Sequence, residues 1–290
     1  MSDATTGLPL PDPIRPPHLV DAGEIDSRLL PVPVRIGAWV ELVDGALVGH
    51  LRVHPTLTRH GVLEPTALVT MIDMLGGLSA DDDVEHWVFT SNMSLRMPPV
   101  PAPDALRCTV STLRAGARSS TSEILINDAG GTPLGMGFVS FSRVPRRPTD
   151  LPKPEFDLEI MGEAWSRIEP LDEPPRDAAG MRVVDAATGH LELDLADKVN
   201  NPAGALHGAM IGMLLAAAAE TLADTTVGGA HVAGDLDIRY LNQARSGPVA
   251  TRARFVGDPE LGSVVVDLVD HGRDDVLVAV ATVRTYRVGN

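Results

Sequence analysis

The residues of this chain best suited to chemistry are a carboxylate within an apolar segment and a polar turn in the second half of the sequence. Asp73 lies inside the apolar run 67–78, where an unpaired carboxylate costs much free energy and is often functional. Asn201 can donate hydrogen bonds from its side-chain amide. Gly208 stands where a second apolar run begins, and backbone N–H groups at the start of a helix stabilise negative charge. The sequence therefore offers an acid and an anion-binding turn, in different halves.

Those two halves are copies of one domain. Residues 35–145 align with residues 178–288 at a constant offset and without a gap. In this alignment the apolar run 66–78 matches the run 209–221. Leu95-Arg96-Met97 coincides with Ile238-Arg239-Tyr240. A fixed offset over this length identifies an internal repeat.

The chemistry-bearing positions differ between the copies. Asp73 coincides with Ala216, so only the first copy has the acid. Gly208 coincides with Pro65, which has no backbone N–H to donate. Each copy therefore holds one half of a site, and the intact site must be shared between them.

Proline-rich segments flank the copies. Residues 1–33 and 146–176 are punctuated by prolines, which disfavour long helices and central strands. We therefore divide the chain into an N-terminal arm (1–33), a first domain (34–145), a linker (146–176) and a second domain (177–290). Two short helices are expected in the arm and the linker, at 22–29 and 158–168.

Within each copy, the pattern predicts two strands, a loop, one long helix and four further strands. Leu191 and Leu193 alternate with Glu192 and Asp194, as in a half-buried strand. The expected strands are 36–42, 46–53, 87–97, 106–113, 121–127 and 134–144 in the first copy, and 181–184, 189–195, 232–240, 249–256, 264–269 and 276–287 in the second. This order predicts an α+β fold in which an antiparallel sheet encloses an apolar helix, and the two sheets can join edge to edge.

The composition narrows the function further. The 290 residues carry a net charge of −15, which disfavours nucleic acid as a partner. The single Cys108 excludes an internal disulfide, and the nine histidines show no metal-ligand spacing, so we expect no metal. The sequence has no long apolar span, no secretory signal and no phosphate-binding glycine loop. We expect a cytoplasmic protein that needs no cofactor and does not enter a membrane.

Residues 201–209 read Asn-Pro-Ala-Gly-Ala-Leu-His-Gly-Ala. This segment resembles the Asn-x-x-Gly-x-x-His-Gly-Gly motif of the hotdog-fold acyl-CoA thioesterases of the PaaI-like type, with Ala209 in place of the last glycine. The resemblance implies two fused hotdog domains that form a pseudo-dimer within one chain. It also implies hydrolysis of acyl-CoA to a free acid and CoA.

The same resemblance implies roles for individual residues. The family's catalytic aspartate falls on Asp73 of the first copy, where it would attack the thioester or activate water, and Thr90 would assist it. Asn201 and Gly208 would hold the oxyanion, and His207 would shape their loop. The second pseudo-site would be inactive, because it would combine Ala216, Ala233, Thr58, Glu64 and Pro65.

Other residues are expected to bind the substrate. The acyl tunnel would be lined by Met71, Met74, Leu75, Met213 and Leu214, because methionine side chains adapt to many shapes. Arg96 and Arg239 occupy equivalent strand positions and would meet the phosphates of CoA, or would simply be solvated arginines.

Two further functions stay open on the same fold. One is an enoyl-CoA hydratase or dehydratase, although His207 follows Asn201-Pro202 at a greater distance than that pattern requires. The other is a protein that binds acyl-CoA without turnover. The sequence leaves the acyl chain length open, and it does not decide whether Asp73 acts as a nucleophile or as a general base. It also leaves open whether the second pseudo-site binds ligand and whether two such chains form a homodimer.

Overall fold

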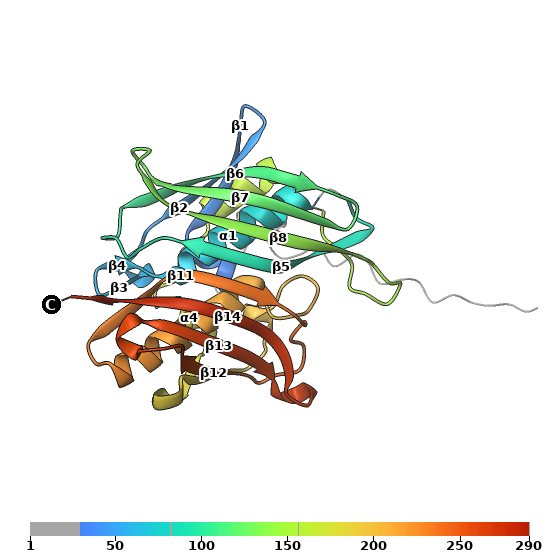
Figure 1. Ribbon diagram of the computed structural model, residues 1–290. Coiled ribbons are helices and arrows are strands. Elements are labelled where there is room, and N and C mark those ends of the chain that lie inside the picture. The colour runs from blue at the N-terminus through green and yellow to red at the C-terminus, as the bar shows by residue number, and fades with distance from the viewer. Residues whose placement is uncertain (1–29, 82, 156, 290) are drawn as a thin grey trace, which may run out of the picture.

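A computed structural model of the chain describes residues 30–81, 83–155 and 157–289. In this part of the chain a twelve-stranded antiparallel sheet runs through both repeats in the order β1-β2-β6-β7-β8-β5-β11-β14-β13-β12-β10-β9. Figure 1 shows the two halves of this sheet stacked one above the other, each curved around its own helix. The expected 22–29 helix lies outside the described residues.

The sheet has an equal contribution from each repeat. The first repeat provides β1 (Ala38–Val43), β2 (Ala46–Arg52), β5 (His86–Arg96), β6 (Ala105–Ala115), β7 (Ser119–Asp128) and β8 (Pro133–Pro145). The second provides β9 (Arg182–Asp185), β10 (His190–Leu193), β11 (Ala230–Tyr240), β12 (Val249–Phe255), β13 (Ser263–Asp270) and β14 (Val276–Val288). Every strand predicted from the sequence is present, with ends that differ by a few residues.

The two half-sheets join through β5 and β11, which pair antiparallel with Leu95 opposite Leu236 and Ser94 opposite Asp237. The expected edge-to-edge junction is therefore confirmed. Because Leu95 and Leu236 are fully buried beneath this seam, the apolar cores of the two repeats are continuous across it.

Each half-sheet encloses one long helix, α1 (Pro65–Ala80) or α4 (Gly208–Thr226). Most side chains of both helices are buried, as expected for helices that are apolar on nearly every face. The helices contact each other at Gly212, where an added Cβ would lie 3.2 Å from Cγ2 of Val69. The absence of a side chain at Gly212 thus allows the two repeats to approach closely at their helices.

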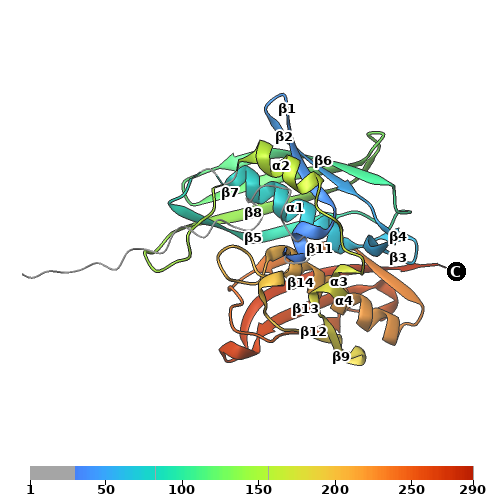
Figure 2. The same ribbon diagram turned by 180° about the vertical axis from the view of Figure 1, so that it is seen from behind.

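The structure adds elements to the segments expected to be loops. A small two-stranded sheet, β3 (Thr58–Arg59) and β4 (Val62–Leu63), precedes α1, and its turn is built by His60 and Gly61 with positive φ values of 54° and 78°. In the linker, α2 (Leu158–Ser166) begins where the sequence predicted and packs against β1, and α3 (Pro175–Ala179) follows it (Figure 2). Six short 3-10 turns complete the described elements: Val32–Arg35, Pro55–Leu57, Ala186–Thr188, Asp197–Val199, Pro259–Leu261 and His271–Arg273.

Among the helices that the structure describes, none combines the length and the apolar character needed to cross a bilayer.

Candidate active site

The position of Asp73 follows from the crossing of the two long helices. Val69 and Asp73 are one turn apart on α1 and so lie on the same face of that helix. Because Val69 contacts α4 at Gly212, this face carries the Asp73 carboxylate toward the beginning of α4. Asp73 is 7% exposed and thus lies almost entirely within the protein, at the boundary between the repeats.

The carboxylate of Asp73 lies directly against Gly208, the first residue of α4. A Cβ added to Gly208 would be 2.8 Å from Oδ2 of Asp73 and 2.9 Å from Oδ1. Any side chain at this position would therefore collide with the carboxylate. The acid of the first repeat and the helix start of the second repeat are therefore in contact, as the prediction of a shared site requires.

Thr90 holds the Oδ1 atom of the Asp73 carboxylate in place. Its hydroxyl donates a hydrogen bond of 2.6 Å to Oδ1 of Asp73. The pairing of β5 with β8 shifts register between Thr90 and Asn92, which is the signature of a β-bulge. Bulges redirect side chains and are common beside active sites. The bulge is thus a local reason why the Thr90 hydroxyl reaches the helix enclosed by its own sheet.

His207 contacts both the acid and the helix. Its Nδ1 atom lies 3.2 Å from Oδ2 of Asp73 and 3.2 Å from the backbone nitrogen of Ala209, so that His207 is the N-cap residue of α4. Nδ1 accepts from the Ala209 N–H in one tautomer and donates to Asp73 in the other. Burial lowers the pKa of the imidazole, and the charge of Asp73 opposes this shift only in part. A neutral imidazole beside the acid follows at neutral pH.

Asn201 organises the turn that leads into α4. Its Oδ1 atom accepts hydrogen bonds from the backbone nitrogens of Ala203, at 3.0 Å, and Ala205, at 3.1 Å. Its own backbone N–H donates to the carbonyl oxygen of Ala205 at 2.7 Å. The side-chain oxygen is therefore engaged within the turn, and the Nδ2–H groups are the part of Asn201 that a substrate oxygen can use.

Sequence reasoning did not assign a role to Tyr240, although it lies beside the same turn. The Tyr240 hydroxyl donates a hydrogen bond of 3.2 Å to the carbonyl oxygen of Gly208. Burial, and then the charge of Asp73, raise the pKa of this hydroxyl well above its usual value, which keeps it protonated. The sequence did offer a signal that could have singled out Tyr240. Its equivalent in the first repeat is Met97, and the chain has only two tyrosines.

The residues expected to line the acyl tunnel lie on different faces of the two long helices. Met71 and Leu75 point toward Gly49 of β2, where an added Cβ would be 2.8 Å from a side-chain carbon of each. They lie two positions before and after Asp73 and so project from the opposite side of α1. Met74 is partly buried, and two further residues, Met213 and Leu214, are fully buried in α4. Their contact with an acyl chain remains a prediction.

The two arginines lie on the outer face of the sheet, away from the helices. Arg96 forms an ion pair of 2.6 Å with Asp237 of the neighbouring repeat, and Arg239 donates to the carbonyl oxygen of Ile238 at 3.3 Å. A groove of about 570 Å³ lies on this face beside Arg96, and Asp73 is not among its lining residues. The structure therefore does not bring the arginines to the carboxylate.

The position that the repeat relates to the candidate site holds a buried network of charges. Glu220 of α4 is fully buried, and its Oε1 atom accepts a hydrogen bond of 2.9 Å from the backbone nitrogen of Ala233, the counterpart of Thr90. Its Oε2 atom accepts from Arg59 at 2.7 Å and from Arg176 at 3.0 Å. Glu220 is therefore an internal acid with two cationic partners.

Arg176 of the linker helix α3 extends this network to the first repeat. Its guanidinium lies 3.0 Å from Oε1 of Glu64, the counterpart of His207. Burial raises the pKa of Glu64, against the lowering effect of the Arg176 charge. The linker thus places a cation between two buried acids, at the position where the symmetry of the chain would put a second anion-binding turn.

Searches against protein-family models and against curated proteins find no match for this chain. Solved structures do match it over most of its length. The TesB protein of Mycobacterium avium subspecies paratuberculosis is 12% identical, with a TM-score of 0.58 over 85% of this chain and 94% of that chain. The 12:0-ACP thioesterase of Umbellularia californica is 9% identical, with a TM-score of 0.56 over 86% and 94%. A candidate oleoyl thioesterase of Lactobacillus plantarum is 15% identical, with a TM-score of 0.58 over 87% and 96%.

This chain is a double hotdog. The likeness extends over both repeats and over nearly the whole length of each matched structure, and at these identities it establishes the fold. The predicted fold class, two fused domains that each wrap an antiparallel sheet around a central helix, is confirmed. In this double hotdog, the candidate site lies where the helix of the first repeat meets the start of the helix of the second.

Proposed function

We propose that this double hotdog hydrolyses acyl-CoA thioesters to a free acid and CoA at the site formed by Asp73 and Gly208. The proposal rests on one observation above all: the Asp73 carboxylate lies against the first residue of α4. A carbonyl group bound there would have an acid on one side and the N–H groups of a helix N-terminus on the other. The matched structures named as thioesterases, and the PaaI-like motif at residues 201–209, support the same reaction.

Two routes are consistent with this arrangement. In the first, Asp73 takes a proton from a water molecule, the resulting hydroxide adds to the carbonyl carbon, and the C–S bond breaks as the thiolate leaves and is protonated. In the second, an oxygen of Asp73 adds to the same carbon and displaces the thiolate, and water then hydrolyses the mixed anhydride. In both, Gly208 donates its N–H to the developing oxyanion, which is worth a few kcal/mol per donor in such sites. Thr90 orients the carboxylate through Oδ1.

The decisive experiment is the Asp73→Asn substitution. It keeps the size of the side chain and removes its charge, so the fold should be retained while release of free thiol from acyl-CoA falls by at least about 100-fold. Asp237→Asn is the matched control, because Asp237 is an acid of the same type that pairs with Arg96 on the outer face. A folded Asp73→Asn protein with full activity would contradict the proposed site.

The same assay separates the other functions. A panel of acyl-CoA substrates of different chain lengths should release CoA, with the preferred length revealed by kcat/KM. Tight binding without thiol release would instead indicate a binding protein, and hydration of an enoyl-CoA with the thioester intact would indicate a hydratase.

The carrier of the acyl group is a second question, because one of the matched structures is an acyl-ACP thioesterase by name. We favour CoA over an acyl carrier protein for this chain, because its net charge of −15 opposes association with an acidic protein. Comparing the same acyl group on CoA and on a carrier protein tests this choice directly. A higher kcat/KM for the carrier-bound substrate would overturn it.

A further inference from the structure

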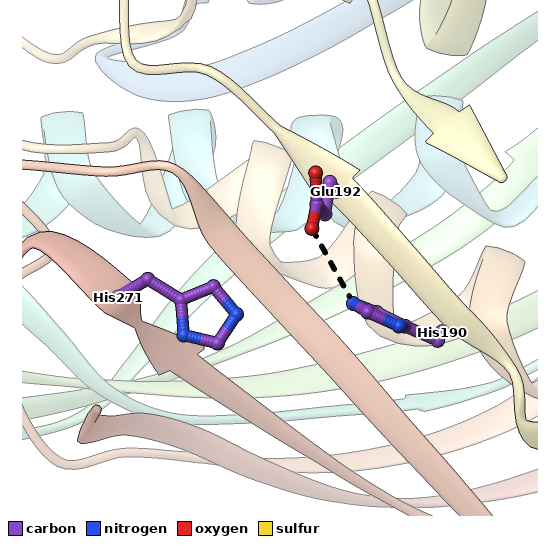
Figure 3. Close-up of side chains that lie close together, drawn as sticks. All are labelled: His190, Glu192 and His271. Carbon is purple, nitrogen blue, oxygen red and sulfur yellow. Dashed lines mark ion pairs between the residues drawn. The ribbon is translucent and has the colours of Figure 1, made fainter. Parts of the chain in front are cut away.

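Three side chains that sequence spacing did not connect lie together at the far edge of the second repeat. His190 and Glu192 alternate with the buried residues Leu191 and Leu193 on β10 and so share the outer face of that strand. His271 follows β13 in the turn before β14. Figure 3 shows its imidazole pointing toward Glu192 and His190. No spacing pattern reveals this set, because the strand pairing alone brings His271 to β10.

The distances suit a small metal ion. One ligand atom from each of the three residues lies within 4.8 Å of the others, and Nε2 of His190 is 3.6 Å from Oε1 of Glu192. Zinc–ligand bonds of about 2.0–2.1 Å at tetrahedral angles place neighbouring ligand atoms roughly 3.3 Å apart. The pair on β10 therefore has nearly the required separation, and the ligand atom of His271 lies within 4.8 Å of both.

Two of the ligands are held by second partners. Nδ1 of His271 contacts Oδ1 of Asp275, which leaves Nε2 as the nitrogen available to a metal. Arg182 donates to Oε2 of Glu192 at 3.2 Å, and Oε1 is the oxygen that faces His190. A carboxylate behind a ligating histidine is a recurring feature of metal sites. The positive charge of Arg182 is shared with Asp194, 2.6 Å away.

The backbone beneath the cluster is also fixed. Asp270, immediately before His271, is fully buried and accepts hydrogen bonds from the backbone nitrogens of Gly247, at 2.8 Å, and Gly272, at 3.1 Å. Ala250 of β12 lies directly opposite Glu192 in the sheet and is only 2% exposed, although its strand alternation places it on the outer face. Side chains therefore cover Ala250, so this part of the outer face, beside Glu192, is shielded from solvent.

We propose that His190, Glu192 and His271 bind one divalent ion of the zinc type, with water completing the coordination. Two neutral imidazoles and one carboxylate are a common ligand set for zinc, and the side chains are 30%, 25% and 31% exposed, so an ion can enter from solvent. The ion would tie β10 to the turn after β13. This link matters because β10 pairs with β12 at only Glu192–Ala250 and Leu193–Val249.

The test is a metal titration of the full chain after removal of bound metal with a chelator. Zinc is added in competition with a chromogenic chelator, and cobalt serves as a spectroscopic probe of coordination geometry. We expect one ion per chain at this site and a rise in Tm with zinc. His190→Ala and His271→Ala should each weaken zinc binding by at least about tenfold. Glu192→Gln, which preserves the shape of the side chain, should also weaken it.

The matched control is His50→Ala, because His50 also lies beside a carboxylate, 3.1 Å from Glu41, but belongs to no group of three potential metal ligands within the described part of the chain. Zinc binding by this variant should equal that of the unmodified chain. Circular dichroism of each variant establishes that it is folded. No zinc binding by the unmodified chain, or equal binding by the His190, His271 and His50 variants, would overturn the proposal.

Discussion

The carboxylate of Asp73 and the α-carbon of Gly208 belong to different repeats, yet they are so close that a methyl group on the glycine would lie 2.8 Å from Oδ2. This approach accompanies the pairing of β5 with β11, which joins the two repeats. It results from the crossing of α1 and α4, which also brings Val69 against Gly212. Glycine at position 208 thus serves the geometry of the site as well as the start of the helix.

Gly208→Ala should therefore inactivate the proposed hydrolase. The new methyl group would push the Asp73 carboxylate away from the helix start, and we expect thiol release to fall by about 100-fold or more, since small displacements of reacting groups have effects of this size. Gly77→Ala is the control, because a Cβ there would be 3.7 Å from the Phe141 ring, an ordinary contact. The control should keep its activity and gain a little stability. Equal activities for the two variants would argue against the contact being functional.

Thr90→Val should lower activity without unfolding the protein. The substitution keeps the shape of the side chain and removes the 2.6 Å hydrogen bond to Oδ1 of Asp73. Hydrogen bonds to charged groups contribute about 1.5–3 kcal/mol, so kcat should fall by roughly 10- to 100-fold. Thr121→Val removes a comparable strand hydroxyl that bonds to Ser140 instead, and steady-state kinetics should show little change. A fully active Thr90→Val enzyme would show that the carboxylate needs no such support.

Tyr240→Phe tests the residue that sequence reasoning left without a role. Loss of the hydrogen bond to the Gly208 carbonyl should loosen the turn and reduce kcat several-fold, because Tyr240 acts through Gly208 rather than on the substrate. The raised pKa of its hydroxyl implies that ionisation of Tyr240 does not shape the pH profile of the proposed reaction. The pH–rate profiles of the two proteins should therefore have the same midpoints. A profile that changes shape would give Tyr240 a direct part in proton transfer.

Arg176→Met should destabilise the fold more than it affects the active site. It would leave Glu64 and Glu220 buried with one cation fewer, and breaking such a pair typically costs about 3–5 kcal/mol of unfolding free energy. Arg254→Met is the control, since Arg254 is exposed and its pair with Asp267 should contribute less than about 1 kcal/mol. Denaturant unfolding measures both. Equal losses would mean that the buried network contributes little to stability.

His207 gives the stability a pH dependence of known sign. Its pKa is below the usual value of 6.5 in the folded chain, so the unfolded chain takes up the proton first as the pH falls. The unfolding free energy should therefore decrease from about pH 7.5 to 5.5, and His207→Gln should make that decrease shallower. Urea unfolding at several pH values checks this. An unchanged slope in the variant would show that His207 is not responsible.

The sequence predicted most of the architecture, because each pattern that indicates a strand or a helix occurs once in each of the two repeats. The alternation in Leu191–Leu193 and the uniform apolar character of the helices identify the strands and the enclosed helices. The edge-to-edge junction was expected because each of the two sheets has edge strands that need a partner. The closeness of Asp73 to Gly208 was expected from the complementary losses in the two copies.

What the sequence did not show depends on contacts between distant segments. The buried network needs Arg59, Arg176 and Glu220, which come from the first repeat, the linker and the second repeat. Likewise, His271 joins His190 only through the pairing of strands. The β3–β4 sheet was missed because strands of two residues carry no measurable alternation.

The pairing of β5 with β11 also restricts how the protein can work. Rotating one repeat away from the other would break the backbone hydrogen bonds that run along this seam, and such a joint cannot serve as a hinge. If the proposed reaction takes place, substrate enters and product leaves by local shifts of loops and side chains, while the two halves keep a single alignment.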